Sequence, residues 1–254
     1  MILRRLGNKK KLAKKIQGYF PEHKIYIEPF FGAGGMFFNK PKARYNILND
    51  NDSDVFNLFM VVIHKQDELK EYLKKMPISE DLWNHWKLNQ EIKPVLKAIR
   101  FLFLSNFGYM GKPETLRFNN GNTLELVMKK INETHDFIFG SEFMNTDFRN
   151  VFKKISFKGE KEKIQTFCYC DPPYLDTNNN YQTGFTERDS FDLFEVLNKS
   201  GVNWAMSEFN HPFILKQARE RSLNINIIGE RRNLKNRRIE ILVTNYKKAQ
   251  GTLF

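Results

Sequence analysis

The sequence predicts an α/β fold, in which a mostly parallel sheet is flanked by helices and interrupted by a mainly helical insertion. Three observations support this prediction. After about residue 136, short β-branched and aromatic runs alternate with helical stretches; two similar runs precede residue 51; and the segment between has helical spacing. The length of 254 residues suits one such domain with an insertion, or two small domains.

The first half of the chain predicts two strands followed by helices. HKIYIEPF (23–30) and RYNILND (44–50) are rich in β-branched and aromatic residues and are predicted strands. A helix is predicted from Asp52 onward, with an Asp/Ser start and a break at Pro77. SEDLWNHWKLN and PVLKAIRFLFLSNF are predicted helices, and 108–122 is a predicted loop because it is rich in Gly, Pro and Asn.

The second half alternates between the two patterns. FIFGSEF, TFCYC, VNWAMS, INIIG and IEILVTNY are predicted strands, and FRNVFKKI, SFDLFEVLNK and PFILKQARER are predicted helices between them. Cys168 and Cys170 alternate along one strand, so we expect both on one face, in the core of a reduced, intracellular protein. We therefore assign 1–55 and 136–254 to the sheet domain and 56–135 to the insertion.

Charge gives the first indication of function. The formal net charge is +12 and the pI is about 9.5, which favours a polyanionic partner such as nucleic acid, although a solvated lysine-rich surface is the alternative. No run approaches the ~20 apolar residues needed to span a membrane. The chain shows no export signal and no cluster of metal-ligating residues. We expect a cytoplasmic protein that binds neither membrane nor metal.

Three predicted strands end in an acid or a glycine-rich turn: Glu28 before FFGAGG, Asp50, and Asp171. Ligands of open α/β sheets bind beyond the carboxyl ends of the strands, so these residues predict one shared site. Gly32 and Gly34 allow a tight turn and a close approach of the backbone to a ligand. A carboxylate about twenty residues past such a turn can accept both hydroxyls of a ribose. Asp52 or Ser53 can cap the following helix, which leaves Asp50 for the ligand.

The motif DPPY (171–174) is the most specific signal in the sequence. Two prolines make a rigid turn, in which the Asp171 carboxylate and the Pro172 carbonyl can together accept both hydrogens of one amino group. Tyr174 can then stack against a flat ring that carries the amine. The alternative is an ordinary loop start with a packed tyrosine. The position directly after an apolar strand favours the site.

In this order of motifs the chain resembles the Dam-type (D12 class, alpha group) DNA adenine-N6 methyltransferases along its whole length. The resemblance implies a Rossmann-like sheet that binds S-adenosylmethionine, an inserted target-recognition domain, and methyl transfer to adenine N6 in double-stranded DNA with base flipping. Catalytic residues are implied within DPPY: Asp171, Pro172, Pro173 and Tyr174. Cofactor contacts are implied from RRLGNKKKL, IEPFFGAGG, ILNDND, NTDF and DPPY: Arg5, Lys9, Glu28, Phe30, Gly32, Gly34, Asp50, Asp147, Phe148 and Asp171.

The same resemblance places Phe185, within TGFTERDSFDL, beside Tyr174 in the target-base pocket, and a basic hairpin in RRNLKNRRIEILVTNY. Donors and acceptors in the loop 106–122 and nearby basic residues are the candidate DNA contacts: Lys10, Asn106, Tyr109, Lys112, Arg117, Asn119, Asn120 and Arg237. The chain also departs from the family pattern. KPETLRFNNGN shortens the recognition loop, so no recognition sequence is carried over, and MSEF replaces the usual Ser-Asn, which leaves Glu208 without a role.

Several alternatives stay open at this point. The acceptor of the methyl group could instead be cytosine N4, adenine in RNA, or a protein glutamine; by resemblance, Asp171 favours adenine. A basic DNA-binding module without activity is a further alternative, which intact Gly32, Gly34, Asp50 and Asp171 disfavour. The resemblance also suggests a monomer in a bacterial, archaeal or phage-infected cell, with a restriction endonuclease as a conceivable partner in restriction-modification.

Overall fold

The computed structural model describes residues 2–3, 9–109, 113–118, 123–176, 184–232 and 237–247, and only the backbone of residues 231, 232 and 237. Within these ranges, seven strands form one sheet in the order β3-β2-β1-β4-β5-β7-β6. The strands are β1 (Ile25–Glu28), β2 (Tyr45–Asn49), β3 (Glu142–Met144), β4 (Thr166–Cys170), β5 (Asn203–Phe209), β6 (Asn224–Arg232) and β7 (Arg237–Thr244).

The sheet is mostly parallel, as the alternating pattern predicts. β1 pairs in parallel with β2 and β4, while β3 and β5 extend the parallel part at either side. β7 runs antiparallel to β5 and to β6, with which it forms a hairpin. The order of the first five strands is that of a Rossmann fold, so a topological switch point lies between β1 and β4.

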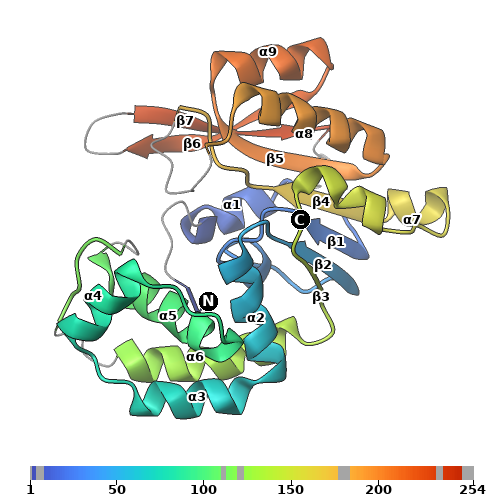
Figure 1. Cartoon of the computed structure of the whole chain (residues 1–254). Coiled ribbons are helices and arrows are strands. Elements are labelled where there is room, and N and C mark those ends of the chain that lie inside the picture. The colour runs from blue at the N-terminus through green and yellow to red at the C-terminus, as the bar shows by residue number, and fades with distance from the viewer. Residues whose placement is uncertain are drawn as a thin grey trace.

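Helices cover both faces of the sheet (Figure 1). On one face, α8 and α9 cover Ile27, Cys168, Cys170 and other apolar side chains. The opposite face, with Tyr26, packs with helices that include α1 and α2. The two cysteine Sγ atoms lie 3.8 Å apart in the core, as expected from their spacing. The helices outside the insertion are α1 (Ala13–Gln17), α7 (Glu160–Ile164), α8 (Glu187–Ser200), α9 (Pro212–Glu220) and the 3-10 turns η1 (Lys9–Lys11), η2 (Phe37–Asn39), η4 (Phe148–Asn150) and η5 (Phe152–Lys154).

The insertion between β2 and β3 is a block of helices to one side of the sheet (Figure 1). Its members are α2 (Ser53–His64), α3 (Gln66–Lys75), α4 (Glu80–Leu88), α5 (Pro94–Phe107) and α6 (Thr123–Ile138). Asp52 caps α2 through its side chain, which accepts a hydrogen bond from the Asp54 N–H at 2.9 Å. Across the described ranges, no helix combines the length and apolar character needed to cross a bilayer.

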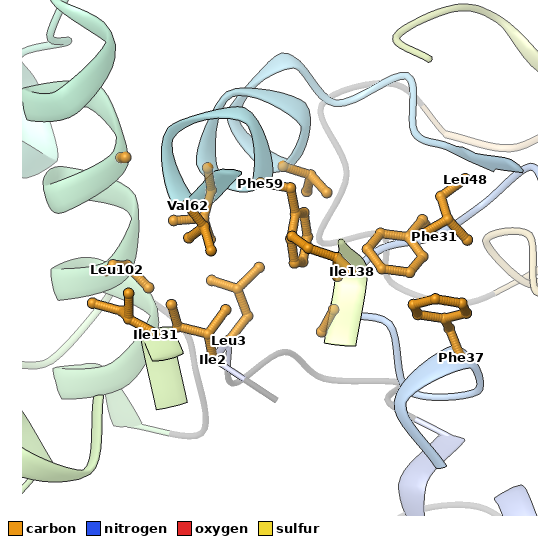
Figure 2. Packing of buried hydrophobic residues seen from close by; sticks show 14 of the residues in the cluster. Ile2, Leu3, Phe31, Phe37, Leu48, Phe59, Val62, Leu102, Ile131 and Ile138 are labelled. Atoms are coloured by element: carbon orange, nitrogen blue, oxygen red, sulfur yellow. The ribbon is translucent and has the colours of Figure 1, made fainter. Parts of the chain in front are cut away.

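One hydrophobic cluster connects this block to the sheet. Figure 2 shows Ile2 and Leu3 beside Leu102 of α5 and Ile131 of α6, with the side chains of α2 close by. The same cluster continues to Phe31 and Leu48 at the sheet. The insertion therefore shares its core with the sheet and is held against it by apolar packing.

Three predicted elements differ in the structure. The helix predicted from Asp52 to Pro77 is divided into α2 and α3 at Lys65, whose φ of −138° is not helical. FIFGSEF is predicted to be a strand, but Phe137 and Ile138 complete α6, and β3 comprises only 142–144. Ile131, Thr134 and Ile138 form a buried stripe on α6, and the seven residues of FIFGSEF are too few to show this helical spacing. Gly140 follows the helix with φ +72°. FRNVFKKI is predicted to be a helix but forms the two 3-10 turns η4 and η5, the first of which the Asp147 side chain caps.

Candidate active site

Polar residues follow four adjacent parallel strands at the carboxyl edge of the sheet. Glu28 ends β1, Asp50 follows β2, Asp147 lies just beyond β3, and Asp171 follows β4 directly. Because these strands are neighbours in the order β3-β2-β1-β4, the sheet brings the predicted acids to one edge. This edge includes the switch point between β1 and β4, where ligands of open α/β sheets bind.

Asn49, which sequence reasoning missed, ties the loops at this edge together. Its Nδ2 donates to the Pro29 carbonyl at 2.9 Å and to the Thr146 carbonyl at 3.0 Å, and its Oδ1 accepts from the Thr146 N–H at 3.1 Å. The side chain is almost fully buried. A polar residue at the last position of a strand, directly before the acid Asp50, is the signal that could have identified it.

Asp50 organises the glycine turn. Its Oδ2 accepts a hydrogen bond from the Gly32 N–H at 2.6 Å, and its Oδ1 accepts one from the Asp52 N–H at 2.9 Å. The sequence prediction that Asp52 caps α2 is confirmed, but Asp50 also carries two backbone contacts of its own. A ligand hydroxyl at Asp50 would share the carboxylate with these backbone donors.

The two glycines of the turn serve different purposes. Gly34 has φ +69°, and a Cβ there would lie 2.4 Å from the Phe38 ring, so packing requires glycine. Gly32 also has a positive φ, +53°, yet a Cβ there would meet no atom of the described residues within 4 Å. The backbone at Gly32 therefore faces open space, where a ligand can approach it closely.

Three phenylalanines from distant segments meet beside this turn. Ring centroids of Phe30, Phe148 and Phe185 lie 5.5–6.0 Å apart. The sequence predicts the first two as cofactor contacts and the third as part of the target pocket, so the fold brings both predicted sites into contact. Arg149 stacks 4.4 Å from the Phe148 ring centroid and is held by three acids, Asp147, Asp189 and Asp192.

The DPPY turn lies directly against a buried lysine. β4 is buried along its whole length, whereas the Asp171 side chain is 22% exposed. Lys9 Nζ lies 3.1 Å from Asp171 Oδ1 and hydrogen-bonds the Tyr174 hydroxyl. Tyr174 was expected to offer its ring to a base, but the ring is buried and the Lys9 ammonium lies 4.3 Å from its centroid. A base that stacks on Tyr174 has to displace these neighbours.

Acidic side chains gather at the carboxyl edge of the sheet, within a basic chain. Burial raises the pKa of Glu28 to about 8, and the nearby carboxylates of Asp171 and Asp50 act in the same direction, while the Tyr26 hydroxyl opposes them through a 2.8 Å hydrogen bond. Such a cluster favours a cationic ligand. No group of three or more His, Cys, Asp or Glu in the described residues could hold a metal ion. A separate cavity of about 720 Å³ lies at the amino edge, near Lys24 and Gln165.

The predicted DNA contacts have different outcomes. Tyr109 and Arg117 are exposed on the two arms of a short hairpin, joined by a bridge between Gly108 and Leu116, and Lys10 is exposed as well. The prediction for Asn106 is wrong: the side chain is buried and donates to the Ile2 and Leu102 carbonyls at 3.1 Å, so it supports the core. Four predicted site residues lie outside the described residues: Arg5, Lys112, Asn119 and Asn120. Arg237 is described only by its backbone.

Two buried glutamates complete the surroundings of DPPY. Glu240 on β7 lies 2.8 Å from Lys9 Nζ. Glu208 on β5 accepts from the Phe209 N–H at 2.8 Å, and burial raises its pKa to about 8. The sequence marks Glu208 as unusual without a role and does not single out Glu240. An acid inside an apolar strand, as in RRIEILV, is the signal that indicates it.

Sheet order and site together define a Rossmann-like enzyme class, in which a nucleoside-containing cofactor binds at the carboxyl edge beside the switch point. The comparison with known families is specific. The model for D12 class N6 adenine-specific DNA methyltransferases matches residues 6–232, and the chain belongs to this family.

Relatives agree with this assignment. The chain is 30% identical to the DNA adenine methylase of Haemophilus influenzae over 73% of its length and 66% of the relative. It is 24% identical to the enzyme of the same name from Escherichia coli K12, over 84% and 79% of the two chains. An rRNA methyltransferase structure from Streptomyces viridochromogenes superposes with a TM-score of only 0.42, at 10% identity, over 92% and 82% of the chains, and carries no part of the assignment.

The predicted class is therefore confirmed. The protein is an adenine-specific DNA methyltransferase that uses S-adenosylmethionine to methylate adenine N6 in DNA. The family assignment favours adenine N6 in DNA over cytosine, RNA and glutamine as the methyl acceptor.

Proposed function

We propose that the crevice beyond β1, β2 and β3 holds S-adenosylmethionine and that the DPPY turn holds the target amine. When bound, the cofactor supplies an electrophilic methyl group on a sulfonium. The residues present fit such a ligand: Asp50 faces the turn where a ribose would lie, Gly32 leaves open space, and Phe30 and Phe148 offer apolar ring surfaces. The acids Glu28, Asp50 and Asp171 complement its positive charge.

Asp171 and the Pro172 carbonyl are proposed to bind the adenine N6 amine. Delocalisation of the nitrogen lone pair into the ring makes this amine a poor nucleophile. Two acceptors that hold its hydrogens favour a pyramidal nitrogen and stabilise the positive charge that develops as the new bond forms. The turn is rigid because both prolines fix φ, so most of the rate enhancement would come from positioning.

The amine is inaccessible in a stacked duplex, so the target adenine is proposed to flip into the pocket. Phe185, on the segment after DPPY, contacts both Phe30 and Phe148 and can form one wall between base and cofactor. Tyr174 can form another wall once the Lys9 side chain moves from its ring. Lys9 therefore borders the proposed target pocket. Its contact with the cofactor remains a proposal that the family resemblance implies.

The helical block α2–α6 is proposed as the target-recognition domain. Its hairpin presents the exposed Tyr109 and Arg117, whose guanidinium lies 5.7 Å from the tyrosine ring centroid. An aromatic ring and a guanidinium together can contact bases and phosphates. The predicted contacts at Lys112, Asn119, Asn120 and Arg237 remain part of this proposal from the sequence.

The observation that supports these assignments most strongly is the meeting of Glu28, Asp50, Asp147 and Asp171 at the ends of four adjacent strands. Asp171→Ala tests it. We expect methyl transfer from tritiated S-adenosylmethionine to unmethylated duplex DNA to fall at least about 100-fold, since one of two acceptors is lost. DNA binding, measured by fluorescence anisotropy, should stay close to that of the original protein. Unchanged turnover in the variant would refute the assignment of Asp171.

Single-read methylation mapping of DNA from cells that express the protein would identify the recognised sequence and strand preference. We propose a monomer that acts on one strand at a time, which sedimentation with and without DNA would test. A cognate restriction endonuclease remains a prediction of the resemblance.

A further inference from the structure

Lys9 is a buried cation with three oxygen partners. Its side chain is 2% exposed, and Nζ lies 3.1 Å from Asp171 Oδ1 and 2.8 Å from Glu240 Oε1. The third partner is the Tyr174 hydroxyl. An ammonium group carries three N–H donors, so each oxygen can take one of them.

Glu240 closes this network into a ring of contacts. The Tyr174 hydroxyl accepts from Lys9 and donates to Glu240 Oε1 at 3.1 Å. The Tyr174 ring packs edge-on against Phe209, with centroids 4.7 Å apart. Rotation of the tyrosine is therefore restrained both at its hydroxyl and at its ring.

A second residue of β7, Arg238, contacts the chain just after the DPPY turn. Arg238 and Glu240 are two residues apart on the strand and so lie on the same face. Arg238 donates to the Leu175 carbonyl at 3.4 Å and to the Asp176 carbonyl at 2.9 Å. The strand thus contacts the chain just after DPPY while Glu240 contacts the tyrosine within it.

We propose that Glu240 is a positioning residue for methyl transfer, acting through Lys9 and Tyr174. With two carboxylates around it, the ammonium is shared between Glu240 and Asp171. An ammonium bound to Asp171 alone would compete more strongly for the oxygen that is to accept the adenine amine. This inference rests on the proposed roles of Asp171 and Tyr174.

Glu240→Gln is the direct test, because it keeps the size and the acceptor oxygen but removes the charge. We expect single-turnover methyl transfer to unmethylated duplex DNA to slow about 10- to 100-fold, as for a small misplacement of a reacting group. The dissociation constants of S-adenosylmethionine, by calorimetry, and of DNA, by anisotropy, should change much less.

The chain offers a matched control. Glu195→Gln makes the same change in an ion pair on α8, where Glu195 Oε1 lies 2.9 Å from the Arg221 guanidinium and contacts no site residue, and we expect an unchanged rate. Glu240→Asp restores the charge and should recover part of the lost rate. If Glu240→Gln had the original single-turnover rate per folded molecule, the inference would be wrong, while an inactive Asp171→Ala would still support the proposed function.

A second variant covers the case in which Glu240→Gln does not fold. Lys9→Met/Glu240→Leu removes both charges, and apolar replacement of a buried pair is commonly tolerated by the fold. We expect this variant to be folded by circular dichroism and to bind DNA, yet to transfer methyl groups slowly even at saturating S-adenosylmethionine. Transfer at the original rate under saturation would overturn the inference.

Discussion

At the scale of residues, the site depends on acids in unusual surroundings. Glu28 and Glu208 are both buried, and burial raises the pKa of each to about 8. Both are therefore largely protonated at neutral pH in the absence of ligand. Within the described residues, Glu208 Oε2 has no hydrogen-bond partner, which fits a group that avoids ionisation. A cationic cofactor near Glu28 would lower its pKa and favour the charged form.

Glu208 leads to a prediction about pH and stability. Its pKa is about 8 in the folded protein, against the ordinary glutamate value of 4.5, so between these values the unfolded chain has released a proton that the folded protein keeps. The free energy of unfolding should fall as pH rises through this window, by up to about 1.4 kcal/mol per pH unit, and the effect should end above it.

Glu208→Gln removes this contribution, so its stability should fall less steeply between pH 5 and 8. Urea denaturation followed by circular dichroism at several pH values measures the slopes. Glu28 also has a raised pKa, in the original protein and in the variant alike, so Glu208→Gln should reduce the pH dependence of stability without abolishing it. Parallel curves for the two proteins would contradict the prediction.

At the scale of elements, the turn after β1 combines a packed glycine with an open one. Gly34 lies against the rings of Phe31 and Phe38, while Gly32 borders open space. The Gly32 N–H is nevertheless fixed by Asp50, so the open side of the turn has a defined position. The turn is thus rigid on its core side and accessible on its ligand side.

These two glycines should respond differently to the same substitution. Gly34→Ala introduces a clash as well as an unfavourable φ, so we expect a loss of about 2–4 kcal/mol in the free energy of unfolding. Gly32→Ala has only the unfavourable φ and should cost about 1–2 kcal/mol, but its methyl group enters the proposed cofactor space. Denaturation and calorimetry with S-adenosylmethionine separate the effects. Equal cofactor affinity for Gly32→Ala and the original protein would argue against that position for the ligand.

At the scale of the whole molecule, the distribution of charge distinguishes the proposed binding regions for S-adenosylmethionine and for DNA. The chain carries +12 overall, yet the carboxyl edge of its sheet gathers Glu28, Asp50 and Asp171. A cationic methyl donor and an anionic duplex are therefore attracted to different parts of one protein. The helical insertion, which shares a core with the sheet, keeps the proposed DNA-binding hairpin in a fixed relation to the crevice.

Salt should consequently affect the two ligands unequally. If about six phosphates are contacted, the affinity for duplex DNA should fall roughly 1,000-fold between 50 and 200 mM salt. The affinity for S-adenosylmethionine should change only slightly, because that site is small and partly buried. Anisotropy and calorimetry at matched salt concentrations provide the comparison, and a salt-independent affinity for DNA would count against a phosphate-binding surface.

Local sequence determined much of this molecule. Glu28, Asp50 and Asp171 are recognisable because each follows an apolar run, and such runs form buried strands whose ends lie at one edge of a parallel sheet. Gly32 and Gly34 are recognisable because their spacing allows backbone that other residues disfavour. The DPPY turn is rigid whatever surrounds it, because proline fixes its own φ.

Tertiary structure alone decided which side chains are accessible and which partners they have. Asn106 has the chemistry of a base-contacting residue, but packing places it in the core beside Ile2. Lys9 is one of three consecutive lysines, and only the fold buries it between Asp171 and Glu240, residues more than 160 positions away. Local pattern cannot specify such partners, because long-range contacts depend on how strands are ordered and helices packed, not on neighbours in the chain.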